Sequence, residues 1–149
     1  MVLQNEYIGG VTWGFGGKRG SWKNDTAEQS MELMSSTTGT NWTAIALSAL
    51  QATPQSTEIP YWQNPTVTDE EVKWAISKAK SLNLKVCLKP IVNCADGTWR
   101  AHINFFDKDV PCEPKWSEWF SSYNAFILHY AAIAEETGCE MFCIGCELV

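Results

Sequence analysis

The residue with the clearest chemical potential is Glu147, which lies near the end of the last apolar segment. That segment, residues 141–149, reads Met-Phe-Cys-Ile-Gly-Cys-Glu-Leu-Val and has the length of a strand. Continuous apolar runs of this length are typical of strands that are covered on both faces of a parallel sheet. Burial of an unpaired carboxylate is costly, so an acid there either pairs with a cation or transfers a proton. Glu147 is therefore our candidate general acid/base, and an exposed Glu that opens the next loop is the alternative.

Lys89 is a second candidate because it interrupts the apolar segment 85–92. A buried ammonium group is rare unless it is paired, so Lys89 belongs either to a structural salt bridge or to a site. We favour the site, because Lys89 and Glu147 both lie near the ends of their predicted strands. Side chains alternate along a strand, which places Lys89 on the same face as Asn93.

Aromatic residues supply further candidates. The chain holds 8 tryptophans in 149 residues, and aromatic rings exposed in clefts bind partly apolar ligands such as sugar rings, although most of these residues are expected in the core. Trp13 ends the first apolar segment, and Trp99 with Arg100 lies in the middle of a long loop, residues 93–115. A loop of that length in a compact domain is usually functional or disordered, and we favour a functional loop.

These residues require a fold that brings several strand ends together. Apolar segments predict strands at 8–13, 42–47, 85–92 and 141–149, and helices are predicted between each pair of neighbouring strands. Strict alternation of strand and helix implies a parallel sheet with helices outside it, in a doubly wound sheet or a (β/α) barrel. In both folds the chemistry gathers at the C-terminal ends of the strands. We therefore expect Trp13, Lys89, Asn93 and Glu147 at one edge of the sheet.

The predicted helices carry recognisable end signals. Thr26 with Gln29 and Thr68 with Glu71 match the capping box that begins a helix. The third helix is predicted over 117–137 and ends at Gly138. Its predicted buried stripe consists of Phe120, Tyr123, Ile127, Ala131 and Ala134.

Composition excludes several classes of partner. A net charge of −6 without a stripe of Lys and Arg argues against nucleic acid. No apolar stretch has the length of a membrane span. Residues 1–6 carry no secretion signal, so we expect a cytoplasmic protein.

The six cysteines allow two further interpretations. Cys94 and Cys112 lie in a loop and are the one pair considered for a disulfide, although free thiols are favoured. Cys139, Cys143 and Cys146 have the spacing of an iron-sulfur cluster in radical enzymes that cleave S-adenosylmethionine. If this segment is a strand, Cys139 and Cys146 lie ~23 Å apart, which weighs against a cluster.

Four sequence motifs together resemble glycoside hydrolase family 113, the β-mannanases of glycoside hydrolase clan A. They are Gly-Val-Thr-Trp13, Leu-Lys89-Pro, Gly97-Thr-Trp-Arg100 and Ile-Gly-Cys-Glu147-Leu. The resemblance implies a (β/α)8 TIM barrel and hydrolysis that retains anomeric configuration, without a metal or cofactor. It implies that Glu147 is the general acid/base, and that Trp13, Lys89, Asn93, Trp99 and Arg100 line the subsites for a β-linked, mannan-like saccharide.

The chain departs from the expected pattern in sequence and in length. Cys146 precedes the acid/base where the clan commonly has Asn, and Ile91 follows Lys89-Pro90 where a polar residue is expected. A whole barrel takes about 250 residues, and a retaining glycosidase needs a second carboxylate as nucleophile. We therefore interpret residues 1–149 as the N-terminal half of the barrel, ending after the fourth strand. A non-catalytic sugar-binding half-barrel is the remaining alternative.

Overall fold

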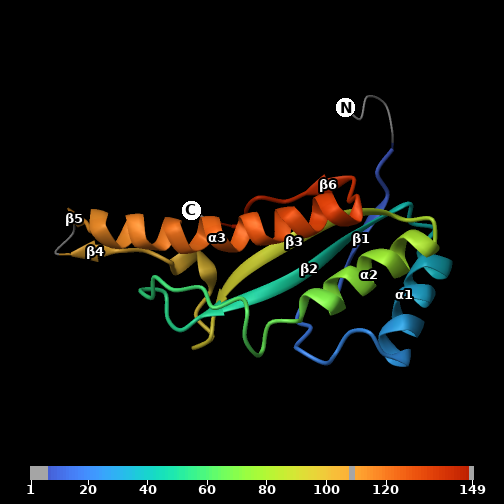
Figure 1. Ribbon diagram of the computed structural model, residues 1–149, viewed down its shortest axis with the longest axis horizontal. Helices are drawn as coiled ribbons and strands as arrows, with labels where there is room; N and C mark the ends of the chain where they lie inside the picture. The colour runs from blue at the N-terminus through green and yellow to red at the C-terminus, as the bar shows by residue number, and fades with distance from the viewer. Residues whose placement is uncertain (1–6, 108–109, 148–149) are drawn as a thin grey trace.

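The computed structural model describes residues 7–107 and 110–147 of the chain. Four parallel strands form one sheet in the order β1-β2-β3-β6, and three α-helices connect them (Figure 1). The main elements are β1 Gly10–Trp13, α1 Asp25–Thr38, β2 Trp42–Gln51, α2 Asp69–Ser81, β3 Lys85–Cys94, α3 Glu113–Thr137 and β6 Met141–Phe142. The loop after β3 adds η1 Arg100–His102 and an antiparallel pair, β4 Phe106–Asp107 and β5 Val110–Pro111. The predicted alternation of strand and helix is confirmed.

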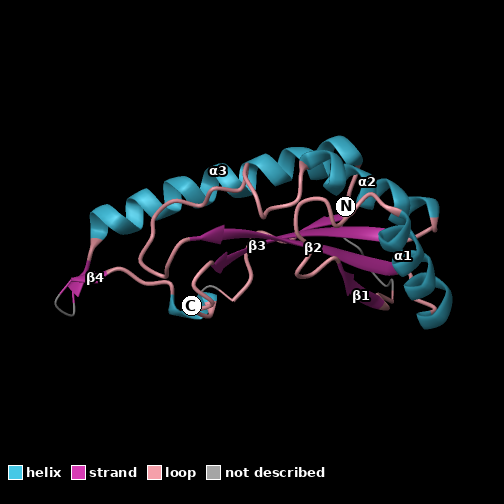
Figure 2. Cartoon of the chain, turned by 90° about the horizontal axis from the view of Figure 1, so that it is seen from below, coloured by secondary structure: helices cyan, strands magenta, loops and turns pink. Residues whose placement is uncertain are grey.

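All three helices cover the same face of the sheet. Figure 2 shows α3 and α2 along one side of the sheet with α1 beside α2, and buried residues of all three helices belong to one core cluster with the strands. A doubly wound sheet carries helices on both faces, but a (β/α) barrel carries them only on the outside. The one-sided cover therefore matches half of a (β/α)8 barrel, as the resemblance implied. We call the sheet face that carries no helix the inner face.

The hydrophobic core fills the space between the helices and the outer face of the sheet. Strand residues of one parity point into it, and those of the other parity point to the inner face. In β3 the core residues include Val86, Leu88 and Val92, which cluster with Val72 and Ile76 of α2. The intervening residues of β3, Lys89 and Asn93 among them, therefore face inward.

The N-cap of the first helix lies two residues earlier than predicted. Asn24 is the N-cap of α1, and its side-chain oxygen accepts a hydrogen bond of 2.9 Å from the backbone N–H of Ala27. The predicted box of Thr26 and Gln29 is wrong, because Thr26 already lies inside the helix. The box of Thr68 and Glu71 at α2 is confirmed with both of its hydrogen bonds.

The buried stripe of α3 is rotated from the predicted one. Tyr123 and Ala134 of the predicted stripe are buried, but Phe120 is exposed, and the other buried residues are Trp119, Phe126, Tyr130 and Ile133. Trp119 fixes this rotation, because its indole N–H donates a 2.8 Å hydrogen bond to the side chain of the buried Gln51 in β2. Both stripes have helical spacing, so only contacts with the sheet distinguish them.

The fourth strand is much shorter than predicted. Regular pairing covers Met141–Phe142, and one more ladder bond of 2.9 Å runs from the N–H of Cys143 to the carbonyl of Leu88. Beyond it, Ile144 is exposed, and residues 148–149 lie outside the described part of the chain. The physical reason is that β6 has β3 as its one partner strand in the described part of the chain, so a single ladder must hold the segment.

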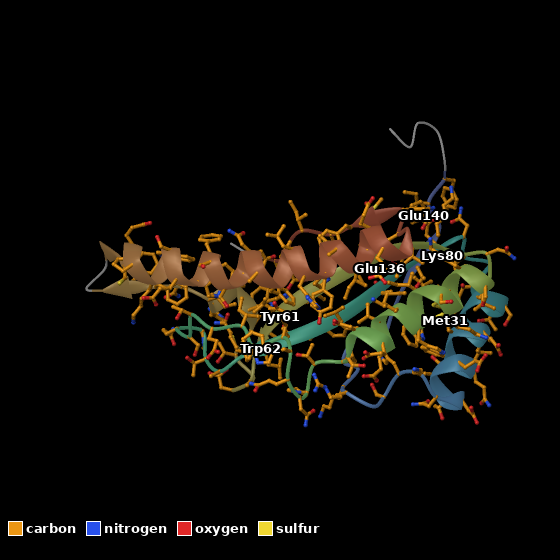
Figure 3. All side chains as sticks on the ribbon, viewed as in Figure 1. Met31, Tyr61, Trp62, Lys80, Glu136 and Glu140 are labelled. Carbon is orange, nitrogen blue, oxygen red and sulfur yellow. The ribbon has the colours of Figure 1, made fainter. Side chains whose placement is uncertain are left out.

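Polar contacts secure the start of β6. The Glu140 carboxylate accepts a 2.8 Å hydrogen bond from the N–H of Val86 and lies 3.7 Å from the Lys80 ammonium. Figure 3 shows Lys80 and Glu140 together where α2, α3 and β6 meet, with Glu136 of α3 close by. These contacts hold the register of β6 where its pairing is shortest.

The structure bears on the expectations about membrane spans and disulfides. No helix in the described ranges is long and apolar enough to cross a bilayer. All six cysteines are free thiols, so Cys94 and Cys112 do not form a disulfide. Residues 1–6, on which the expectation about secretion rests, lie outside the described part of the chain.

Candidate active site

Glu147 meets three of the five other predicted site residues at the C-terminal edge of the sheet. Its Oε2 atom lies 2.6 Å from Nη2 of Arg100 and accepts a 3.0 Å hydrogen bond from the indole N–H of Trp99. Arg100 in turn donates from Nη1 to Oδ1 of Asn93 over 2.8 Å. The four side chains therefore form one connected polar cluster on the inner side of the sheet.

The loop after β3 turns sharply to deliver Trp99 and Arg100. The backbone of Gly97 is left-handed, with a φ of 83°, which suits a residue without a Cβ. The Asp96 side chain accepts a 2.9 Å hydrogen bond from the N–H of Thr98 and closes the turn. The helix η1 then begins at Arg100, and its short turn brings this side chain back over Asn93, seven residues earlier.

The hydrogen bonds to Glu147 are strongly one-sided. Both Trp99 and Arg100 contact Oε2, whereas Oε1 forms no hydrogen bond with any residue in 7–107 or 110–147. The Glu147 side chain is 49% exposed, and Trp99 is 57% exposed. The Arg100 side chain, by contrast, is only 11% exposed. One carboxylate oxygen is thus anchored and the other is open to a ligand.

The backbone of Glu147 is itself unusual. Its φ of 55° lies in the left-handed region, which costs a residue with a Cβ about 1–2 kcal/mol. Strained residues of this kind cluster at functional sites, where the surrounding structure holds them. Here Arg100 and Trp99 provide part of that hold.

Lys89 reaches the same inner face but stands apart from the cluster. The register pairs Lys89 with Ala46 of β2, and parity places it on the face of Asn93, as predicted. Within the described ranges its ammonium group forms no hydrogen bond or ion pair. The salt-bridge alternative for Lys89 therefore finds no partner among these residues.

Trp13 is not brought into the cluster. Its ring is buried, packs on Trp22 with centroids 5.1 Å apart, and donates a 3.2 Å hydrogen bond to the hydroxyl of Ser30 in α1. The register explains this orientation, because Trp13 pairs with Ile45, whose side chain lies in the core. Trp13 therefore ends its strand on the outer face, toward α1.

The cysteine segment does not assemble a cluster site. The Cys139 thiol contacts the Thr137 hydroxyl, that of Cys143 contacts the carbonyl of Gly145, and that of Cys146 lies 3.7 Å from Arg100. Among the residues that the structure describes, no three His, Cys, Asp or Glu side chains gather as metal ligands. The geometry thus disfavours the iron-sulfur alternative.

Two residues that support the site were not predicted from sequence. Ser48 of β2 accepts a 3.1 Å hydrogen bond from the Asn93 amide, and strand parity would have placed it on the inner face. Tyr123 of α3 donates a 2.8 Å hydrogen bond to the carbonyl of Ile144 and so holds the segment that leads to Glu147. No local sequence signal announces the second contact, since it joins elements 21 residues apart.

Tyr123 makes a pH-dependent contribution to stability. Burial, reinforced by the nearby Cys143 and Cys146, raises the pKa of Tyr123 from 10 to about 12. The neutral phenol is favoured in the folded state, so its contribution is complete below pH 10 and is lost as the pH rises toward 12. Between pH 10 and 12, ionisation of Tyr123 should lower the free energy of unfolding by at most about 1.4 kcal/mol per pH unit. Urea unfolding at a series of pH values would measure this fall.

The substitution Tyr123→Phe removes the titrating group and should flatten that fall. At neutral pH the variant should be less stable by about 1 kcal/mol, because the bond to the Ile144 carbonyl is lost. Burial also raises the pKa of Tyr130, so part of the slope should persist. An unchanged slope in Tyr123→Phe would contradict the assignment.

The chain is similar to a known protein family and to several solved structures. The model of Glycoside Hydrolase Family 113 matches residues 11–149. A solved complex of a β-1,4-mannanase of that family is 51% identical, with a TM-score of 0.90. The match covers 97% of this chain and 47% of the mannanase chain. The β-mannanase AaManA of Alicyclobacillus acidocaldarius, solved in complex with ManMIm, is 43% identical, with a TM-score of 0.88. This match covers 96% of this chain and 45% of the AaManA chain. No curated protein matches, and this chain spans less than half the length of these solved enzymes.

Proposed function

The chain belongs to glycoside hydrolase family 113, and on that basis we propose that it contributes the acid/base half of a retaining endo-β-1,4-mannanase. Glu147 is the general acid/base in this proposal. The nucleophilic carboxylate comes from outside these residues, since the chain spans less than half of its solved relatives. Trp99, Asn93 and Lys89 are the proposed surroundings of the substrate, whereas Trp13 lies on the outer face beside Ser30 and Arg100 contacts the Glu147 carboxylate.

One observation carries the proposal. Glu147 sits at the C-terminal edge of the sheet with Oε2 held by Arg100 and Trp99 and Oε1 unengaged by any described residue. A general acid must be oriented and must still present an oxygen to the group that it protonates. The Glu147 geometry meets both requirements.

The proposed reaction uses Glu147 twice. In the first step its Oε1–H gives a proton to the glycosidic oxygen as the bond to the anomeric carbon breaks, while the second carboxylate attacks that carbon. In the second step the Glu147 carboxylate takes a proton from the water that displaces the enzyme from the sugar. For this order the two carboxyl groups must lie about 5–5.5 Å apart in the complete barrel.

The neighbours of Glu147 suit a neutral saccharide. The exposed ring of Trp99 offers an apolar face on which a sugar ring can stack. Asn93 and Lys89 on the inner face offer polar groups for sugar hydroxyls, and the Lys89 ammonium has no ion-pair partner in the described ranges. A β-1,4-linked mannan is the proposed substrate, because the solved relatives are described as β-1,4-mannanases.

Incubation of the full-length enzyme with linear β-1,4-mannan tests the proposal. We expect shorter mannooligosaccharides as products, and NMR of fresh products should show retained β configuration at the new reducing end. Inverted products would contradict the mechanism. Binding of mannan without hydrolysis would instead support the alternative of a carbohydrate-binding barrel.

A further inference from the structure

We infer that Arg100 is a positioning residue, which anchors Oε2 of Glu147 so that Oε1 alone exchanges protons with the substrate. This inference rests on the proposed function of Glu147. It differs from the expectation that Arg100 lines a sugar subsite, because it assigns the guanidinium to the carboxylate and not to the saccharide.

The first support is the set of partners around the guanidinium. Nη2 lies 2.6 Å from Oε2 of Glu147 and 3.7 Å from the sulfur of Cys146, and Nη1 donates to Asn93 over 2.8 Å. Asn93 itself is held by the hydroxyl of Ser48 over 3.1 Å. Arg100 thus links a regular strand of the sheet to a carboxylate on a segment that has lost its regular pairing. A planar guanidinium with several fixed donors suits such a bridge.

The second support is burial. The Arg100 side chain is 11% exposed, compared with 49% for Glu147. Its Nε atom is buried and donates to no acceptor among the residues that the structure describes. A saccharide arriving from solvent therefore meets Trp99 and Glu147 before it meets Arg100.

The third support is that the two oxygens of the Glu147 carboxylate have different roles. Arg100 stays protonated in proteins, so it cannot supply the proton for the leaving group. That proton leaves from Oε1, and the electrons of the broken C–O bond remain with the protonated leaving oxygen. The carboxylate that results is paired with Arg100 through Oε2. In the second step Oε1 takes the proton of the attacking water while the Oε2 contact persists.

A comparison of two substrates separates positioning from sugar binding. An unactivated mannooligosaccharide needs protonation of its leaving group, whereas a 2,4-dinitrophenyl β-mannobioside does not. In the full-length enzyme, Arg100→Met should lower kcat/KM by about 100-fold on the oligosaccharide. On the activated substrate the loss should be no more than about 5-fold, because the sugar contacts are the same and only the need for acid is removed. The conservative Arg100→Lys should recover little, because Lys offers a point charge without the fork that joins Asn93 to Glu147.

Lys89→Met is the matched control, since it also removes a cation from the inner face. Lys89 touches neither oxygen of Glu147, so its loss should affect both substrates by the same factor and mainly through KM. Equal losses on both substrates for Arg100→Met would overturn the inference and assign Arg100 to sugar binding.

A second variant protects the test against misfolding of the arginine variants. Asn93→Ala removes the hydrogen bond that supports Arg100 from the strand. It should lower kcat/KM by about 10-fold on the oligosaccharide and by about 2-fold on the activated substrate. Equal losses in this variant would also overturn the inference. Failure of the underlying function is distinguished by wild-type enzyme that does not hydrolyse mannan, or by Glu147→Gln that hydrolyses it normally.

Discussion

Glu147→Gln in the full-length enzyme is expected to lower kcat on β-1,4-mannan by about 10²–10⁴-fold, the range that general acid/base catalysis supplies. Gln preserves the size of the side chain, and its amide oxygen can still accept from Arg100 and Trp99. It cannot release a proton to the glycosidic oxygen or receive one from water. The loss should therefore appear in the chemical steps, and steady-state kinetics with mannooligosaccharides of defined length would measure it.

Glu140→Gln is the matched control for this variant. Glu140 lies on the same C-terminal segment, but its carboxylate contacts the N–H of Val86 and the ammonium of Lys80 at the opposite end of the sheet. The control should retain kcat within about twofold. The Gln amide oxygen can still accept from the N–H of Val86, and the lost ion pair with Lys80 lies near the surface and contributes little. Near-normal turnover by Glu147→Gln would refute the assignment of the acid/base.

Residues 1–149 alone are expected to show no hydrolysis of mannan. A retaining mechanism needs two carboxylates across the scissile bond, and the proposal places the nucleophile outside this chain. Loss of one member of such a pair removes the covalent step, so the deficit against the full-length enzyme should exceed that of Glu147→Gln. The measurement is product formation by the purified 149-residue chain at a concentration at which the full-length enzyme consumes the substrate completely.

The edges of the sheet add a structural consequence. In the described ranges β1 pairs only with β2, and β6 pairs only with β3. Unpaired edges recruit further strands, so the isolated chain should aggregate more readily than the full-length enzyme. Light scattering would detect this aggregation, and the separately produced remainder of the barrel should suppress it and restore hydrolysis. Turnover of mannan by the 149-residue chain alone would contradict the placement of the nucleophile.

Much of the fold could be predicted because its signals are local. The alternation of apolar segments with helical patterns predicted a parallel sheet, and Thr68 with Glu71 predicted the start of α2. Strand parity predicted that Lys89 and Asn93 share a face, because side chains alternate with a period of two along any strand. These features depend on neighbours within a few positions.

Other features could not be predicted because several choices had the same local pattern. The stripe of α3 has two rotations with equal helical spacing, and the hydrogen bond from Trp119 to Gln51 selects one. The start of α1 depends on whether Asn24 or Thr26 adopts the extended backbone of a cap, and Asn24 does so with a φ of −141°. The length of β6 depends on how many partner strands flank it, which its own residues do not encode.

Some features of the candidate site were also predictable from local sequence, and others were not. The sequence alone marked Glu147, placed Trp99 and Arg100 in a long loop, and put Asn93 at the end of a strand. Only the tertiary structure decided that Arg100 folds back between Asn93 and Glu147, and that Trp13 turns away toward Ser30. The reason is that local pattern specifies the face of a strand on which a side chain lies, whereas the ion pair of Arg100 with Glu147, 47 positions away, requires the crossovers that bring distant segments together.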